Sequence, residues 1–140
     1  MKTRFLILPA LLLVLGTSCN DDDNENYQLP AATLTGKWNY SKTGGIVGGT
    51  ELLTDYTGNE SGCNRDFIEL SNDGAYVEVD YDSSTEPCQA ITSTGTFAVT
   101  GNTVVVDTGD ETFTATILNL SYTELKIQDT ETGAIVLFVR

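Results

Sequence analysis

From Asp66 onward the sequence is a succession of short segments in which apolar and polar residues alternate, each closed by a turn signal. Residues 67–71 and 75–82 are joined by Asn72-Asp73-Gly74, and an Asp-Gly turn between alternating segments is a strong hairpin signal. A period of two residues is typical of strands with one face on a core and the other in solvent. No long stretch of the sequence shows the period of a helix. The sequence therefore predicts an all-β protein.

The predicted strands follow one another along the chain with tight turns between them. They begin near Leu34, Phe67, Ala75, Ile91, Thr103, Glu111, Ser121 and Ala134. About eight consecutive strands of this kind favour a small up-and-down antiparallel β-barrel. We therefore assign residues 34–140 to a single barrel domain.

The first predicted strand, residues 34–40, carries the only tryptophan of the chain on its inward face. Its Gly36-Lys37-Trp38 triplet resembles the opening motif of the lipocalins. The resemblance to bacterial lipocalin-like domains covers residues 34–140 and implies a lipocalin-like barrel. It also implies that an arginine near the end of the last strand packs over Trp38 and plugs the base of the barrel, and Arg140 stands at that place.

Two glycine-rich segments, residues 41–49 and 57–62, are expected to be loops. Because Gly44-Gly45 and Gly48-Gly49 are expected to break any strand, the first of these segments is predicted to be a mobile loop. Lipocalin-like barrels carry a flap over the open mouth at this place, and plain solvated connectors are the alternative interpretation. Residues 50–56 between the two loops are expected to be a short strand or part of that lid.

The alternation assigns one face of each predicted strand to the barrel interior. In the strand 75–82 the inward residues are expected to be Ala75, Val77, Val79 and Tyr81, with the other face in solvent. The residues expected to line a ligand site are Trp38, Tyr40, Val77, Val79, Tyr81, Phe97, Phe113 and Ile117. A barrel of this size is either filled by its own side chains or holds one small ligand, and both interpretations remain open.

Residues 1–18 have the pattern of a secretory signal peptide. Lys2 and Arg4 precede a short apolar run that ends in small residues, and a membrane span needs about 20 apolar residues. Cys19 comes directly after this segment and resembles the lipid-bearing cysteine of bacterial lipoproteins. Acyl chains on Cys19 would hold the protein on a membrane without a spanning helix. A plain signal peptide with an incidental cysteine is the alternative.

Residues 19–33 are expected to form an acidic tether between the lipid and the barrel. The run Asp21, Asp22 and Asp23 cannot bury itself and belongs in solvent. It resembles the acidic export tag of certain Gram-negative lipoproteins. We therefore expect a lipid-anchored protein of the outer membrane, exposed at the cell surface; a simple spacer is the alternative interpretation.

The charge of the chain excludes nucleic acid as a partner. Removing residues 1–18 leaves five basic and twenty acidic side chains, a formal net charge of −15. A chain this acidic is repelled by phosphates. In an oxidising compartment the two remaining cysteines, Cys63 and Cys88, are expected to form a disulfide, worth about 3.5 kcal/mol on the chain-entropy model.

No catalytic, metal or cofactor site is expected. The chain contains no histidine, which removes zinc hydrolysis and the histidine-dependent triads. Asp80, Asp82, Ser84 and Glu86 place oxygens at alternate positions, but Thr85 stands where a calcium loop needs glycine. A polar connector is preferred there, with a weak calcium site as the alternative.

The sequence thus favours a non-enzymatic surface lipoprotein whose lipocalin-like barrel binds a small, mainly apolar ligand. A rival interpretation is a protein-binding module, either an accessory subunit of a surface complex or a protein resembling the lipocalin-like metalloprotease inhibitors. Those inhibitors insert an N-terminal trunk into the protease cleft, and the acidic segment 20–25 is poorly suited to that task. A carboxylate-based hydrolase is the third alternative.

Overall fold

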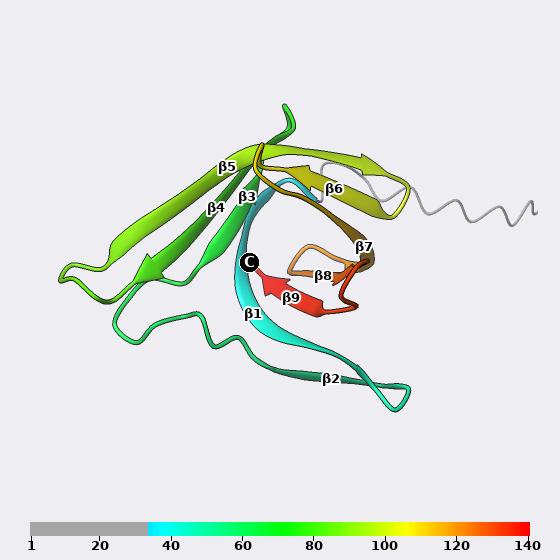
Figure 1. Ribbon diagram of the computed structural model, residues 1–140, viewed down its shortest axis with the longest axis horizontal. Helices are drawn as coiled ribbons and strands as arrows, with labels where there is room; N and C mark the ends of the chain where they lie inside the picture. Colours follow the sequence, from blue (N-terminus) through cyan, green and yellow to red (C-terminus); the bar gives the residue numbers. More distant parts are fainter. Residues whose placement is uncertain (1–33) are drawn as a thin grey trace, which may run out of the picture.

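The computed structural model describes residues 34–140, where its secondary-structure elements are nine β-strands (Figure 1). They are β1 (Gly36–Val47), β2 (Thr50–Asp55), β3 (Phe67–Leu70), β4 (Ala75–Asp82), β5 (Gln89–Thr100), β6 (Thr103–Asp107), β7 (Thr112–Leu120), β8 (Glu124–Asp129) and β9 (Ile135–Val139). The sheet order is β2-β1-β3-β4-β5-β6-β7-β8-β9, all antiparallel, and β1 also pairs with β9. This last pairing closes eight of these strands into a barrel and confirms the predicted fold class.

The predicted signal peptide (1–18) and the tether (19–33), including Cys19, lie outside the described residues. Within residues 34–140 no helix has the length and apolar character needed to cross a bilayer.

β1 is longer than the sequence predicted and pairs with three neighbours. Residues 36–39 pair with β3, residues 39–44 with β9 and residues 42–47 with β2. The predicted loop over residues 41–49 is therefore wrong, because the strand continues to Val47. The turn is confined to Gly48 and Gly49, whose φ angles of 59° and 80° lie in the left-handed region that favours glycine. The strand alternative for residues 50–56 is confirmed by β2.

Gly44 lies inside β1 because the backbone of β2 occupies the space where a side chain would stand. A Cβ atom built on Gly44 collides with the carbonyl oxygen of Leu52, and it also lies 3.0 Å from the Cα atom of Leu53. A Cβ atom on the next residue, Gly45, meets nothing closer than 3.8 Å. A side chain is therefore excluded at Gly44 but can be accommodated at Gly45.

Gly44→Ala is expected to lower the free energy of unfolding by about 1–3 kcal/mol, because the backbone of β2 must shift away from β1. Gly45→Ala is the matched control and is expected to be tolerated, since its added methyl group makes only an ordinary contact. Urea unfolding of the two variants measures the difference. Equal stability of the two would contradict the close approach of β2 to Gly44.

The hairpin between β3 and β4 forms as predicted. Gly74 has a φ angle of 86°, and its amide donates to the carbonyl of Ser71 at 3.0 Å. The carboxylate of Asp73 accepts the amide of Ala75 at 3.1 Å. The Asp-Gly pair therefore supplies both the left-handed backbone and a side-chain acceptor for the turn.

The core lies inside the barrel and consists mainly of residues from strands on opposite sides of the sheet. Its buried members are Leu34, Trp38, Ile68, Leu70, Tyr76, Val104, Val106, Ala115, Ile117, Leu125 and Phe138. Trp38 is fully buried, as the sequence predicted for the inward face of the first strand.

The predicted face assignment on β4 is wrong. Tyr76 belongs to the core cluster and is only 2% exposed, and Glu78 lies on the same inward face of the strand. The predicted inward residues Ala75, Val77, Val79 and Tyr81 lie on the outer face instead.

The outer face of β4 is apolar because it belongs to a second, smaller apolar cluster. Val79 pairs with Phe67 of β3, and the ring of Tyr81 lies 6.5 Å from the ring of Phe67. The ammonium group of Lys37 lies 3.6 Å from the centre of the Phe67 ring. This cluster buries Val79 without any contribution from the barrel interior.

The predicted disulfide between Cys63 and Cys88 is confirmed. It joins the segment between β2 and β3 to the segment between β4 and β5. Asp66 helps to fix the same region: it is 2% exposed, and its carboxylate accepts the amide of Tyr81 at 2.8 Å. The amide of Asp66 donates to the side chain of Asn59 at 2.9 Å. The segment before β3 is thus fastened to β4.

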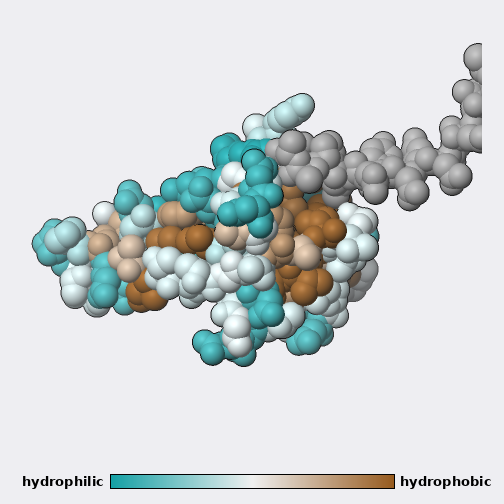
Figure 2. Space-filling model, turned by 90° about the horizontal axis from the view of Figure 1, so that it is seen from above, coloured by the Kyte–Doolittle hydropathy of each residue, from teal (hydrophilic) through white to brown (hydrophobic). Residues whose placement is uncertain are grey.

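Two hairpins extend beyond the barrel wall. β4 and β5 form a long ribbon that projects to one side, and the end of the β1–β2 hairpin projects at another (Figure 1). Figure 2 shows hydrophilic residues gathered at the far end of the molecule where the β4–β5 ribbon ends. The closed part of the barrel, and neither projecting hairpin, encloses the interior space, so a binding site is expected first inside the barrel.

Candidate functional site

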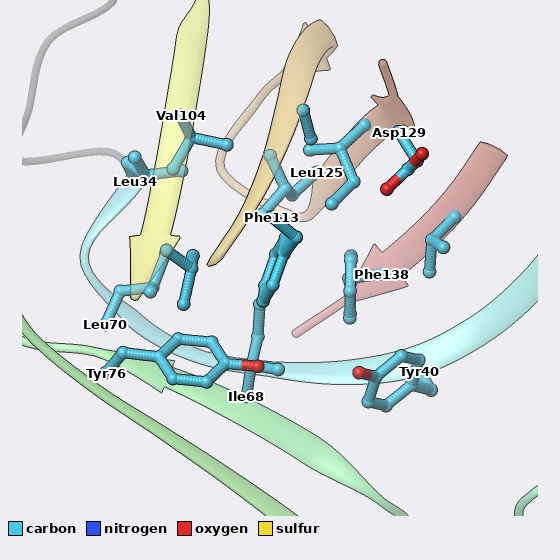
Figure 3. Close-up of a pocket in the computed structure, with 14 residues that line it drawn as sticks. Leu34, Tyr40, Ile68, Leu70, Tyr76, Val104, Phe113, Leu125, Asp129 and Phe138 are labelled. Atoms are coloured by element: carbon cyan, nitrogen blue, oxygen red, sulfur yellow. The ribbon is translucent and has the colours of Figure 1, made fainter. Parts of the chain in front are cut away.

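A cavity of about 150 Å³ lies inside the barrel (Figure 3). It is lined by Leu34, Tyr40, Ile68, Leu70, Tyr76, Val104, Val106, Phe113, Ala115, Leu125, Ile127, Asp129, Val136 and Phe138. Seven strands contribute alternate residues to this wall, because every second side chain of a barrel strand points inward. The wall is almost entirely apolar, so the cavity suits an apolar molecule.

The base of the barrel is closed by Trp38. Its indole Nε1 donates a hydrogen bond to the carbonyl of Leu34 at 2.7 Å. The guanidinium carbon of Arg140 lies 3.9 Å from the centre of the indole ring. Arg140 also donates to the carbonyls of Tyr122 at 2.6 Å and Thr35 at 3.0 Å. The last residue of the chain therefore holds the base of the barrel in place.

The polar side chains that line the cavity are Tyr40, Tyr76 and Asp129, and Glu78 lies behind the two tyrosine hydroxyls without lining the cavity itself. The hydroxyl groups of Tyr40 and Tyr76 each donate to a different oxygen of Glu78, the latter at 3.0 Å. Figure 3 shows the two hydroxyl oxygens turned toward one another at one side of the cavity. The carboxylate of Asp129 lies at another part of the wall.

The surroundings of the tyrosine hydroxyls disfavour their ionised form. Burial raises the pKa of Tyr40 and of Tyr76 well above its usual value, and the charge of Glu78 and the hydrogen bond to it raise both further. The ring of Tyr56 stacks on that of Tyr40 at 4.6 Å, and burial together with the charges of Asp66 and Asp80 raises the pKa of Tyr56 to about 12. These tyrosines therefore remain neutral hydrogen-bonding groups at physiological pH.

A family model described as the lipocalin-like domain matches residues 34–127. The chain belongs to the lipocalin-like domain family.

Two solved structures share the lipocalin-like fold with this chain. A lipocalin-like protein from Bacteroides uniformis ATCC 8492 is similar with a TM-score of 0.55 and 16% identity, over 77% of this chain and 98% of that chain. An uncharacterized protein from Bacteroides eggerthii DSM 20697 is similar with a TM-score of 0.52 and 11% identity, over 76% of this chain and 98% of that chain. Comparison with curated proteins finds no match.

Lipocalin-like proteins are generally binding proteins rather than enzymes. Within residues 34–140, no group of three or more histidine, cysteine, aspartate and glutamate side chains is placed to hold a metal ion. The cavity is therefore the candidate functional site of this lipocalin-like barrel.

The structure places the predicted ligand residues in three different environments. Tyr40 and Phe113 line the cavity. Trp38 and Ile117 belong to the buried core, and Phe97 packs against that core, but none of these three lines the cavity. Val77, Val79 and Tyr81 lie on the outer face of β4, away from the cavity.

The sequence analysis did not place any acidic residue inside the lipocalin-like barrel. Glu78 lies half-buried on the inward face of β4, and two hydroxyl groups from different strands donate hydrogen bonds to it. The available signal was its position two residues after Tyr76, since residues i and i+2 of a strand share a face. The opposite face of β4, with Val77, Val79 and Tyr81, is more apolar, and the sequence therefore predicted that face to point inward.

Arg140→Ala is expected to lower the free energy of unfolding by about 0.5–2 kcal/mol, because the contact with the indole face is lost. Arg140→Lys keeps the charge but not the planar group that lies on the indole and donates to two carbonyls, so we expect it to restore only part of the loss. Thermal unfolding of both variants, monitored through Trp38 fluorescence, measures the effect. A lysine variant as stable as the unaltered chain would show that residue 140 stabilises the barrel only through its positive charge.

Proposed function

We propose that this protein is a lipid-anchored lipoprotein of the outer membrane, exposed at the cell surface, whose barrel binds a small, mainly apolar ligand. The observation that carries the ligand-binding part is the cavity of about 150 Å³ with its nearly apolar wall. An apolar cavity of about this volume stays dry and takes up a molecule of the size of benzene. Lipocalin-like barrels commonly bind small hydrophobic ligands.

Binding of ethylbenzene tests the proposed cavity. The chain carrying Cys19→Ser, which removes the expected lipid acceptor, is purified without detergent and examined by native mass spectrometry for a co-purifying small molecule. Ethylbenzene is then expected to raise its melting temperature. Ala115→Leu is expected to abolish that rise, because Ala115 lines the cavity and the larger side chain fills it.

Ala90→Leu is the matched control, since Ala90 is exposed on β5 and its enlargement leaves the cavity unchanged. Equal ethylbenzene responses of the unaltered chain and Ala115→Leu, or no response in either, would overturn the proposal of a ligand-binding barrel.

The membrane part of the proposal is supported by the pattern of residues 1–33. Mass spectrometry of the cell-purified protein is expected to find acyl chains on Cys19 as the first residue, and Cys19→Ser is expected to release the protein from the membrane fraction. Protease treatment of intact cells is expected to degrade the barrel domain. Protection from protease in intact cells would place the protein on the periplasmic side.

A protein-binding role is the second candidate, and the β1–β2 hairpin favours it. Ile46, Val47 and Leu52 are 53%, 63% and 53% exposed at this projecting hairpin. Val47 and Leu52 share one face of the hairpin, since Val47 pairs with Thr50, and adjacent exposed apolar side chains of this kind are typical of interaction surfaces. If a partner binds there, Val47→Ser together with Leu52→Ser is expected to abolish its crosslinking on cells while leaving ethylbenzene binding unchanged.

A further inference from the structure

The side chains of the cavity wall offer hydrogen-bond acceptors to a ligand. The hydroxyl protons of Tyr40 and Tyr76 are directed to Glu78, so the hydroxyl oxygens have lone pairs left for the cavity. The third polar group of the wall, Asp129, is a carboxylate whose pKa is lowered by hydrogen bonds from the Thr132 amide and hydroxyl and from the Glu131 amide. Complementary ligand groups are therefore hydrogen-bond donors.

Four of the side chains that line the cavity are aromatic. Tyr40 and Phe138 lie with ring centres 4.6 Å apart, and Tyr76 and Phe113 with ring centres 6.1 Å apart. In Figure 3 the two pairs flank the side of the cavity where the tyrosine hydroxyls meet. Aromatic rings grouped around a cavity attract organic cations through their negative faces. The aromatic lining thus favours a positively charged ligand group, and such a group can also donate hydrogen bonds to the acceptors of the wall.

The charge distribution of the barrel strengthens this preference. Residues 34–140 contain five basic and sixteen acidic side chains, and none of the basic ones lines the cavity. Lys42 and Lys126 are paired with Asp55 and Glu51, at 3.0 Å and 2.6 Å. Asp80, beyond Glu78 on the same strand, has a pKa raised by burial and by the charges of Glu78 and Asp66. The carboxylates Glu78, Asp80 and Asp66 near this side of the barrel therefore favour a cationic ligand over an anionic one.

We propose that the ligand of this cavity is a small organic cation, with an apolar body of about the size of one aromatic ring and an ammonium group held by the hydroxyl oxygens of Tyr40 and Tyr76 in front of Glu78. This inference rests on the proposed ligand-binding function and adds the chemical class of the ligand. It excludes carboxylate ligands such as fatty acids, because the lining side chains bring no cation to meet their charge.

Four compounds of one shape test the inference on the Cys19→Ser chain. Calorimetric titration compares phenethylamine, phenethyl alcohol and phenylpropanoate, and the melting temperature reports ethylbenzene. The amine is expected to bind on the order of tenfold more tightly than the alcohol, which is the scale of one charge-assisted hydrogen bond, and the acid more weakly than either. An acid that binds as tightly as the amine overturns the inference.

The same series separates the inference from the proposed function. If ethylbenzene binds but the amine has no advantage over the alcohol, the barrel binds apolar ligands and the inference about the cation is wrong. If none of the four compounds binds, both fail.

Glu78→Gln tests the position of the ammonium group. The amide keeps an acceptor for a tyrosine hydroxyl but removes the charge, so the advantage of phenethylamine over phenethyl alcohol is expected to disappear while ethylbenzene still binds. Glu69→Gln is the matched control: it removes the same charge from the exposed outer face of β3 and is expected to leave the advantage unchanged. An unchanged advantage in folded Glu78→Gln, confirmed by its retained ethylbenzene binding, overturns the assignment to Glu78.

Discussion

Trp38→Ala is expected to lower the free energy of unfolding by about 3–5 kcal/mol, a large part of the stability of a domain of this size. Trp38 is fully buried at the base of the barrel, and its side chain touches elements from both ends of the described chain. Removing the indole leaves a cavity that the paired strands around it cannot collapse to fill. It also leaves the carbonyl of Leu34 without its indole donor and removes the ring face on which the guanidinium group of Arg140 lies. Urea unfolding followed by circular dichroism measures the loss.

Two further variants separate the contributions to this loss. Trp38→Phe keeps a ring for Arg140 but loses the hydrogen bond to Leu34, so it is expected to cost less than the alanine variant. Tyr122→Ala removes a large aromatic side chain that is 85% exposed, and a change of about 0.5 kcal/mol or less is expected. A cost for Trp38→Ala no greater than that for Tyr122→Ala would show that Trp38 does not hold the barrel together.

The sequence predicted the barrel because strand pairing here is local. Each strand from β3 to β9 pairs with its neighbour along the chain, and short turns such as the one at Gly74 specify those pairings. The long-range closure of β1 on β9 followed from the family resemblance and from Trp38. The length of β1 was missed, because Gly44 was read as a strand breaker when it is a point of close approach between strands.

The candidate site was less predictable, because its composition opposes the usual hydrophobic rule. On β4, Val77, Val79 and Tyr81 form the more apolar face, yet the interior face carries Tyr76 and Glu78. Which face of β4 points inward depends on residues of other strands. Tyr40, 38 positions before Glu78, donates the hydroxyl hydrogen bond that makes an inward-facing carboxylate tolerable. A single strand read alone contains no information about that partner.

The tyrosine pair leads to the last prediction, a steep loss of stability at alkaline pH. The unfolded chain releases tyrosine protons near pH 10, whereas Tyr40 and Tyr76 have raised pKa values in the folded protein. Below pH 10 both states hold these protons and their contribution to stability is fully present. Above pH 10 the unfolded state holds fewer protons, so the free energy of unfolding falls as pH rises, by about 1.4 kcal/mol per pH unit for each retained proton.

Tyr40 and Tyr76 alone give a slope of about 2.7 kcal/mol per pH unit, and Tyr56, whose pKa is raised to about 12, steepens it up to that pH, so the domain is expected to unfold cooperatively within about two pH units above pH 10. Ultraviolet absorbance of tyrosinate, recorded with circular dichroism, is expected to show Tyr40 and Tyr76 ionising only as the barrel unfolds. The double variant Tyr40→Phe with Tyr76→Phe is expected to be less stable at neutral pH, since Glu78 loses both donors, but to lose stability more gently above pH 10. Tyr122→Phe, at an exposed position, is expected to leave the alkaline slope unchanged. A folded barrel in which every tyrosine ionises near pH 10 would show that the hydroxyl groups are not held between the core and Glu78.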